Sequence, residues 1–294
     1  MKPKNPFLPG AGPIEPDHAP ATIEWSARSQ SGSRKPVNDD SWLAFASDLN
    51  GADLLEPEGV QSLHDHDLIF AVSDGMGGGN AGDQASKLLL ETLSTIIPDT
   101  FKTAAAGMHP DYFGHMEKAI AQVHDAINAS AEEDEAKKGM AATLALAWFT
   151  PENLYLVNVG DSRIYLHREQ NENSETRMLT LDHTFAWRKF HRGEINERQF
   201  RSHPRRSALY QVVGSGRQAV TPYVAAFSYQ PGDRFLICSD GLIDGLWEKH
   251  IHSAFSTNLD STSSLADSLM TRAITNDGSD DTTLITLAVH ETAE

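Results

Sequence analysis

Apolar residues along the chain fall into several short runs with the length and residue types of β-strands. Most of these runs are continuous or alternate with polar residues, and they are rich in β-branched and aromatic side chains. They comprise residues 68–73, 143–149, 154–159, 163–167, 234–239 and 282–290. The third and fourth runs are separated only by residues 160–162, so we expect this pair to form a β-hairpin.

Two other segments carry apolar residues at helical spacing. One face of residues 83–97 holds Leu88, Leu89, Leu93, Ile96 and Ile97, and one face of residues 113–131 holds Phe113, Met116, Ile120, Val123 and Ile127. Many strands with two helices in mid-chain predict an α+β fold in which sheets pack together under helices. Residues 22–294 contain no internal repeat or linker, so we expect one domain. Residues 1–21, rich in proline and glycine, are expected to be a disordered or extended arm.

Composition narrows the function classes. The 294 residues carry a formal net charge of −17, which argues against binding to nucleic acid or an anionic membrane. No apolar run approaches the roughly 20 residues of a membrane-spanning helix, and the first residues lack a signal-peptide stretch. A single cysteine excludes an intramolecular disulfide framework. We therefore expect a cytoplasmic protein with no nucleic-acid or membrane partner.

Aspartates beside glycine or serine recur at the ends of the apolar runs. They are Asp74, Asp161, Asp240 and Asp280, with a further motif, Asn38-Asp39-Asp40-Ser41, ahead of the apolar stretch WLAFA. Each motif alone is an ordinary turn sequence. Strand ends of one sheet lie side by side, however, so these carboxylates can converge, and they would repel one another unless a cation joined them. Such oxygen ligands suit magnesium or manganese, and two such ions can activate a water and hold a phosphoryl group.

Other chemistries fit less well. Residues 77–82 match G-x-G-x-x-G, but Asp74 stands between the strand and the glycines, where it would repel a pyrophosphate. A cysteine phosphatase would need an arginine six residues after Cys238, and that position is Asp244. Cys238 is therefore expected to be a buried strand residue. The cluster at residues 64–67 is expected to be a solvated loop rather than a zinc site.

Taken in order, the motifs resemble those of the metal-dependent serine/threonine protein phosphatases of type 2C, the PPM family, in its bacterial single-domain form. They are DGMGG (74–78), GMAATLALAWF (139–149), VGDSRIY (159–165), LTLDHT (179–184), HPRRSALYQVVG (203–214), SDGLID (239–244) and SDDTTLITL (279–287). The resemblance extends from residue 23 to residue 289. It implies a central sandwich of two antiparallel sheets flanked by helices, with a metal cleft at one end of the sandwich.

The resemblance also implies roles for the acidic residues. Asp74 would bridge two metal ions, and the Gly75 carbonyl, Asp240 and Asp280 would complete the shell of one of them. The second ion would be held by Asp39 and Asp40, directly or through water. A third, weaker ion would lie between Asp161, Asp240 and Asp244, as in bacterial members.

Departures from the family pattern affect the phosphate end of the site. The family usually has Asn-Glu-Asp where this chain has Asn38-Asp39-Asp40, and the shorter Asp39 is expected to act through water. The family's phosphate-binding arginine corresponds in spacing to Lys35, with Arg34 next to it. Because arginine grips phosphate bidentately and lysine does not, we favour Arg34.

Three further features either differ from the family pattern or leave a choice between residues or roles. The last motif contains Asp280 and Asp281, and we favour Asp280 as the ligand. Met76 replaces the histidine that eukaryotic members use as a candidate general acid. Residues 185–202 correspond to the family's flap. The basic residues of this flap either meet an acidic or phosphorylated substrate or form a plain solvated face.

The resemblance implies hydrolysis of phosphoserine or phosphothreonine by metal-activated water, without a covalent enzyme intermediate. Asp74, Arg34 and Asp40 would be catalytic, and Mn or Mg the cofactor. The expected partners are phosphorylated proteins and a cognate serine/threonine kinase, and the chain is expected to be a monomer. Two alternatives are a pseudophosphatase that binds phosphoproteins or a kinase, and a partner-switching phosphatase of a regulatory system. Because the principal aspartates are all present, the first is disfavoured.

Overall fold

The strands of the computed structural model form two antiparallel sheets. The structure describes residues 21–77, 81–99, 111–170, 173–216, 219–257 and 261–291, so the expected arm lies outside the described residues except for Ala21. The first sheet has the order β10 (Asn173–Met178), β9 (Arg163–Gln170), β13 (Arg234–Cys238), β14 (Thr282–His290), β1 (Thr22–Gln30) and β4 (Glu58–Ser62). The second has the order β11 (Val213–Gly214), β6 (Ala141–Ala142), β5 (Asp67–Met76), β7 (Leu144–Phe149), β8 (Leu154–Val159) and β12 (Tyr223–Phe227). To this path are added β2 (Asp40–Ser47), paired with β5, and β3 (Ala52–Leu54), paired with β2.

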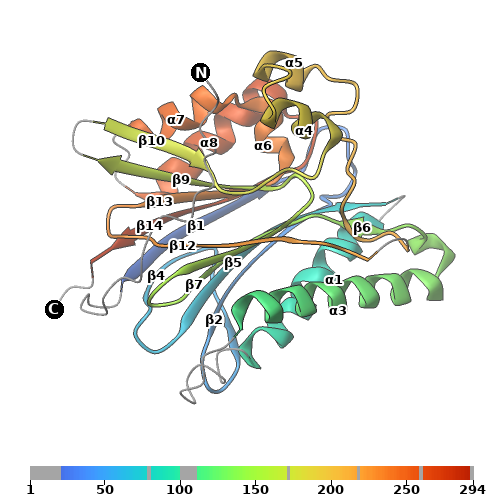
Figure 1. Cartoon of the computed structure of the whole chain (residues 1–294), viewed down its shortest axis with the longest axis horizontal. Helices are drawn as coiled ribbons and strands as arrows, with labels where there is room; N and C mark the ends of the chain where they lie inside the picture. Colours follow the sequence, from blue (N-terminus) through green and yellow to red (C-terminus); the bar gives the residue numbers. More distant parts are fainter. Residues whose placement is uncertain are drawn as a thin grey trace.

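Helices cover both outer faces, which gives four layers (Figure 1). The second sheet is covered by α1 (Ala81–Ile96) and α3 (Tyr112–Glu133). The first is covered by α6 (Asp240–Gly245), α7 (Glu248–Ser256) and α8 (Thr262–Asp277). Two short helices, α4 (Phe185–His191) and α5 (Glu197–Arg201), lie at one end, and a 3₁₀ turn occupies Glu135–Lys137. The expected α+β sandwich flanked by helices is confirmed, and no described helix is long and apolar enough to cross a membrane.

Side-chain alternation in β5 explains why this strand joins two of the layers. Leu68, Phe70 and Val72 point into the core between the sheets. Ile69 and Ala71 point the other way and pack with α1 and α3. A strand buried on both faces reads as a continuous apolar run, which is how the sequence presents it.

The same alternation in β13 ties the first sheet to its helices. Phe235 and Ile237 face the core between the sheets, whereas Leu236 and Cys238 face α6, α7 and α8. Cys238 is fully buried, as expected, and burial raises the pKa of its thiol. This thiol is a packing group and is not exposed to a substrate.

The predicted hairpin is wrong, because its two strands belong to different sheets. β8 pairs with β7 and β12, whereas β9 pairs with β10 and β13. Residues 160–162 therefore cross from one sheet to the other. Gly160 has a φ of 96°, and the Asn158 side chain donates a hydrogen bond to the Ser162 carbonyl at 2.8 Å. The crossing carries Asp161 to the end of the sandwich, between the sheets.

Asp67, at the start of β5, is a buried carboxyl whose titration bears on stability. Its side chain accepts a hydrogen bond from Trp148 Nε1 at 2.8 Å and only 3% of the residue is exposed. Burial raises its pKa from 3.8 to about 7, against the smaller opposing effect of the Trp148 hydrogen bond. Between these two values the folded state binds more protons than the unfolded state, so the free energy of unfolding falls as the pH rises.

We expect Asp67→Asn to be more stable than the unmodified protein at about pH 8, by on the order of 2 kcal/mol. The amide keeps an acceptor for Trp148 but carries no charge to bury. At about pH 4 the two proteins should have similar stability, because Asp67 is then protonated in the folded state. Thermal melts across this pH range measure the difference, and a constant gap at all pH values would contradict the assignment.

Candidate metal centre

Acidic side chains from both sheets meet at one end of the sandwich. Asp40 opens β2 and lies opposite Asp74 of β5 in the antiparallel register. Asp161 lies in the crossing between β8 and β9, and Asp240 opens α6 directly after β13. Asp280 lies just before β14. The carboxylates thus converge as the sequence suggested, but from two sheets rather than one.

Two glycines allow the backbone segments of this region to pass close together. The Gly75 amide donates a hydrogen bond to the Asp39 carbonyl at 3.1 Å. A Cβ at Gly75 would lie 2.0 Å from the Gly82 carbonyl oxygen, and one at Gly241 would lie 2.0 Å from the Asp281 carbonyl oxygen. Both contacts are with backbone, which does not yield easily, so any larger residue at either position would separate the segments that carry the carboxylates.

The electrostatics of the cluster centre on Asp74. Burial, together with the negative charges of Asp240, Asp40 and Asp161, raises the pKa of Asp74 well above its ordinary value. The pKa of Asp240 is raised in the same way, by burial and then by Asp161 and its other acidic neighbours. Mutual repulsion of this kind is relieved when a cation binds between the carboxylates.

Asp40 gives a second sign that the cluster is built for a cation. Its Oδ2 accepts a hydrogen bond from Ser239 Oγ at 2.7 Å, whereas its Oδ1 is buried with no hydrogen-bond partner among the described residues. Burial, with the charges of Asp281 and Asp280, raises its pKa to about 7 despite the opposing hydrogen bonds from Ser239 and Thr283. An orphaned buried oxygen in an all-oxygen donor set fits a hard divalent cation such as Mg²⁺ or Mn²⁺.

Lys35 places a positive charge next to Asp39, Asp280 and Asp281. Its ammonium nitrogen lies 3.4 Å from an Asp39 oxygen, 3.2 Å from Asp280 and 3.5 Å from Asp281. Burial lowers the pKa of Lys35, but Asp280 and Asp74 outweigh it, so the pKa is raised. In the described part of the chain, no three acidic, histidine or cysteine side chains enclose a single metal position as they stand.

Arg34, the phosphate ligand favoured from the sequence, has different surroundings from those of Lys35. This residue is exposed. Hydrogen bonds from Ser279 lower the pKa of the nearby Asp277 carboxyl, and the charge of Arg34 lowers it further. Of the two side chains, Lys35 is the one that lies among the carboxylates. Which of the two side chains binds phosphate stays a prediction.

The residues expected to hold a third ion are neighbours, but one already has a partner. The charges of Asp161 and Asp244 both act on Asp240, and burial raises the pKa of Asp161 to about 7. Asp244 forms an ion pair with Arg206, and its carbonyl accepts a hydrogen bond from Arg201 at 2.6 Å. A third ion would compete with Arg206 for this carboxylate.

Asp280 and Asp281, the two alternatives for the last ligand, have distinct surroundings. The Asp281 side chain is 1% exposed and accepts hydrogen bonds at 2.7 Å from the backbone amides of Gly32 and Asp39. It thereby ties the segment before β2 to the start of β14. The Asp280 side chain is 39% exposed and faces Lys35. Asp280 therefore has the freer carboxylate.

Replacing each of these residues should separate the two roles. Asp281→Ala leaves two backbone amides without their acceptor, and we expect the free energy of unfolding to fall by about 2–3 kcal/mol. Asp280→Ala removes an exposed carboxylate, so its melting temperature without metal should stay close to that of the unmodified protein. Thermal melts in the presence of chelator make the comparison. A larger loss of stability for Asp280→Ala would reverse the assignment.

Two positioning side chains were not singled out from the sequence. Thr143 Oγ1 accepts a hydrogen bond from the Asp74 amide at 2.9 Å and lies 2.7 Å from Ser162 Oγ. Ser239 holds Asp40, as described above. Both side chains are fully buried in the structure. In the sequence, both are polar residues at the end of an apolar run, and this position is the signal that could have identified them.

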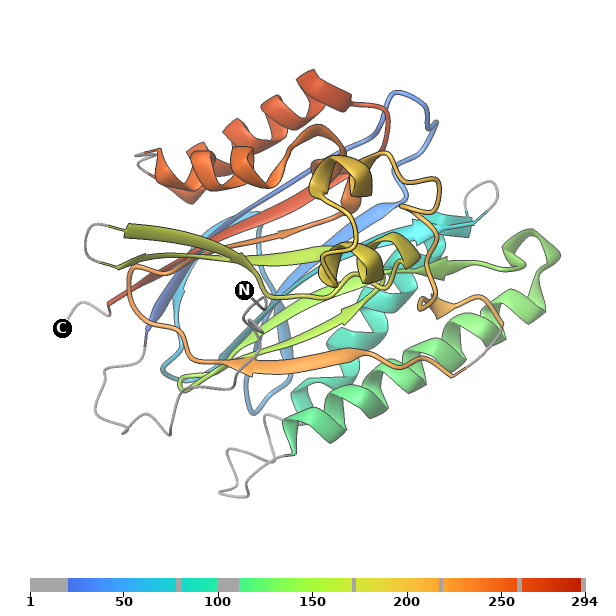
Figure 2. The same ribbon diagram turned by 45° about the horizontal axis from the view of Figure 1, so that its top comes forward.

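The flap segment contains α4 and α5, which lie next to each other (Figure 2), and Arg201 of α5 donates to the Asp244 carbonyl. Arg163 anchors it: its guanidinium donates to both Asp182 oxygens, at 2.7 Å in the shortest bond, and to Glu248 at 3.0 Å. The same group lies 5.2 Å from the ring centre of Trp187 and 5.8 Å from that of Phe200. This buried cation of the first sheet is thus one of the groups that hold the flap, together with the hydrogen bonds that Arg201 donates.

Comparisons with known proteins agree on one protein family. The family model described as protein phosphatase 2C matches residues 46–274. The serine/threonine phosphatase stp of Listeria welshimeri is 32% identical over 228 residues, which cover 77% of this chain and 86% of that protein. The serine/threonine protein phosphatase PstP of Mycobacterium tuberculosis is 31% identical over 79% of this chain and 38% of that protein. The family match does not reach Asp39, Asp40 or Asp280.

Solved structures resemble the whole sandwich. The M. tuberculosis phosphatase PstP/Ppp superposes with a TM-score of 0.73 at 29% identity, covering 92% of this chain and 99% of that one. A structure of the catalytic domain of PstP in complex with two manganese ions superposes with a TM-score of 0.70 at 28% identity, over the same shares. The chain is therefore similar, over 92% of its length, to a phosphatase catalytic domain solved with two manganese ions.

Proposed function

Since the chain belongs to the protein phosphatase 2C family, we propose that it is a metal-dependent protein serine/threonine phosphatase whose ions are held by the cluster around Asp74. The observation that carries this proposal is the convergence of buried, mutually repelling carboxylates from both sheets. Without a cation the cluster is electrostatically unfavourable, and its donor set is the one that Mg²⁺ and Mn²⁺ prefer. The relative solved with two manganese ions supports the same conclusion.

We propose that Asp74 bridges two ions and that Gly75, Asp240 and Asp280 serve one of them. Asp39 and Asp40 would serve the other. When bound, the ions supply the charge that lowers the pKa of water and binds phosphoryl oxygens. The protein's part is to hold the carboxylates in place, and the hydrogen bond between the Asp74 amide and a buried threonine hydroxyl contributes to this.

A third, weaker ion between Asp161, Asp240 and Asp244 remains part of the proposal. Its weakness follows from the ion pair between Asp244 and Arg206, which must be given up or shared. At the phosphate end, Lys35 lies among the carboxylates, and its neighbour Arg34 is exposed. Both are proposed to meet the phosphoryl group, with Lys35 the nearer.

The proposed substrates are phosphoserine and phosphothreonine residues of proteins, and we propose that the chain opposes a serine/threonine kinase. The test is phosphate release from a phosphothreonine peptide with Mn²⁺, with excess chelator, and after Mn²⁺ is restored. We expect activity to disappear with chelator and to return with the metal, because the carboxylates alone cannot activate water. Undiminished activity in chelator would overturn the proposal.

A further inference from the structure

A basic cavity of about 490 Å³ lies between α4 and the segment that follows α5. It is lined by Phe185, Arg188, Lys189, Arg192, His203, Pro204 and Arg205. In a chain with a formal net charge of −17, this is a local concentration of positive charge. We call it the basic pocket.

Most of the positive charge of the basic pocket is not neutralised by the protein. Arg192 forms an ion pair with Glu194 at 2.9 Å. Arg188, Lys189 and Arg205 make no ion pair with a carboxylate of the described residues. Three cations gathered without counter-charges repel one another, and an anion placed between them would remove that repulsion.

Aromatic rings hold two of these cations in position. The Arg188 guanidinium lies 5.6 Å from the ring centre of Tyr210, and that of Arg205 lies 5.8 Å from the ring centre of Phe185. Such contacts orient a guanidinium without cancelling its charge, and its N–H groups stay available to a ligand.

A pair of facing donors gives independent evidence for an anion. The Nδ1 atom of His203 accepts a hydrogen bond from the Arg205 amide at 3.1 Å, so the ring hydrogen is on Nε2. Lys189 Nζ lies 3.5 Å from that Nε2. Both groups carry hydrogens and neither can accept, so the pair lacks the acceptor that would satisfy it. An anionic oxygen in the pocket supplies one.

The basic pocket adjoins the candidate metal centre along the chain on both sides. Arg205 precedes Arg206, which pairs with Asp244 of the cluster. On the other side, the His183 amide donates a hydrogen bond at 2.8 Å to the carbonyl of Gly160, the residue before Asp161. The segments that line the pocket thus also contact the cluster, which is the placement that a substrate residue near the phosphorylated one requires.

We propose that the basic pocket binds a second phosphate on the substrate, so that the preferred substrates are proteins phosphorylated at two nearby residues. The proposal rests on the phosphatase function proposed above. A phosphate carries about −1.5 to −2 charges and three acceptor oxygens, whereas a carboxylate carries one charge and two oxygens. With three uncompensated cations and the Lys189–His203 donor pair to satisfy, the pocket matches the phosphate better.

The test compares otherwise identical phosphothreonine peptides. Near the phosphothreonine, the first peptide carries serine, the second carries glutamate, and the third carries a phosphonate residue that cannot be hydrolysed. In each series this residue is moved one position at a time along the peptide. At the best position we expect kcat/KM for the phosphonate peptide to exceed that for the serine peptide about tenfold, with glutamate between them. p-Nitrophenyl phosphate, which has no second anion, reports the activity of the metal centre alone.

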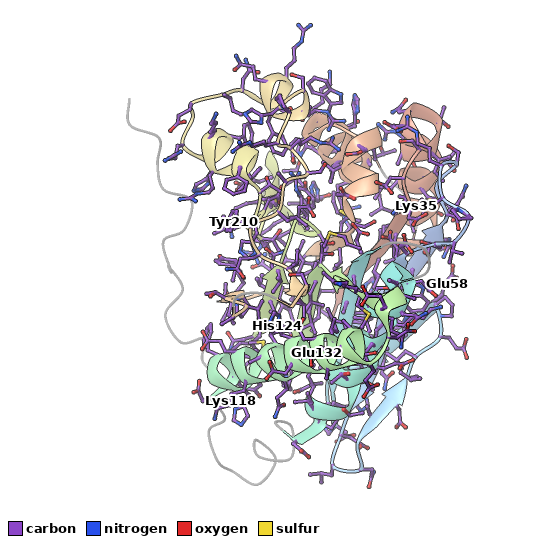
Figure 3. The ribbon with its side chains drawn as sticks, turned by 90° about the vertical axis from the view of Figure 1, so that its right-hand side faces the viewer. Lys35, Glu58, Lys118, His124, Glu132 and Tyr210 are labelled. Carbon is purple, nitrogen blue, oxygen red and sulfur yellow. The ribbon has the colours of Figure 1, made fainter. Side chains whose placement is uncertain are left out.

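The variant Lys189→Ala/Arg205→Ala should lose the preference while its activity on p-nitrophenyl phosphate and on the serine peptide is retained. The matched control is Lys118→Ala/Lys138→Ala, which removes the same charge elsewhere. Lys118 lies on α3, well separated from Tyr210 at the rim of the pocket (Figure 3). The control should keep the full preference.

The following results would contradict the inference. If active enzyme shows no preference, or glutamate serves as well as phosphonate, or the pocket variant keeps the preference, the pocket does not bind a second phosphate. An equal loss in the control would assign the preference to the overall charge. Inactivity on every substrate in the presence of Mn²⁺ would instead overturn the phosphatase function, and this inference with it.

Discussion

Asp74→Asn is expected to lower kcat/KM for a phosphothreonine peptide by about 10³-fold, equivalent to about 4 kcal/mol of activation free energy. The negative charges of Asp240, Asp40 and Asp161 all act on the Asp74 carboxylate and help to raise its pKa. Asparagine keeps its shape but has a single neutral oxygen acceptor, so it cannot bridge two cations. The measurement is steady-state phosphate release at saturating Mn²⁺.

The same substitution should not destabilise the metal-free protein. Removing one of several repelling carboxylates relieves the repulsion, so the melting temperature in chelator is expected to rise. Asp65→Asn, the same chemical change at a side chain that is 79% exposed, serves as the control and should alter neither property. A variant that keeps most of its activity, or that fails to fold, would remove Asp74 from the role proposed for it.

Arg163→Met should destabilise the protein by about 3–5 kcal/mol, because it leaves the Asp182 carboxylate buried without its partner. The side chains of the pair are only 3% and 2% exposed. Methionine fills a similar volume but donates no hydrogen bond, and it also gives up the contact with Trp187 and Phe200 that holds the flap. Equilibrium denaturation with urea gives the free energy of unfolding.

The double variant Arg163→Met/Asp182→Asn separates the cost of the stranded charge from the loss of packing. Neutralising Asp182 should recover a large part of the lost stability, because the unpaired buried charge is then absent. If the single variant loses less than about 1 kcal/mol, or the double variant loses more than the single one, the buried pair does not have the role described.

The parts of the fold predicted from the sequence are those with strong periodicity. The segments predicted as helices at 83–97 and 113–131 correspond to α1 and α3, each of which buries one apolar face. α8 was not predicted, because its serines and threonines dilute the apolar pattern although Leu265 and Leu269 are buried. Local sequence also could not distinguish a hairpin from a crossing between sheets at 160–162, since both need a tight turn between two apolar runs.

The candidate site was predicted residue by residue but not in its contacts. Turn-forming aspartates at strand ends, together with the family resemblance, identified the carboxylates that the structure brings together. The location of Lys35 among them depends on the path of the segment before β2. Asp281 fixes that path through hydrogen bonds to residues 249 and 242 positions away in the 294-residue chain. No local pattern encodes such a contact, so sequence reasoning favoured Arg34 on chemical grounds alone.

The central claim is that the carboxylates at this end of the sandwich bind divalent cations. Calorimetric titration of Mn²⁺ into the metal-free protein, Asp74→Asn and Asp65→Asn tests it directly. We predict saturable binding by the unmodified protein and by Asp65→Asn, and weak or undetectable binding by Asp74→Asn. Binding by Asp74→Asn equal to that of the unmodified protein, or no binding by any of the three, would contradict the claim.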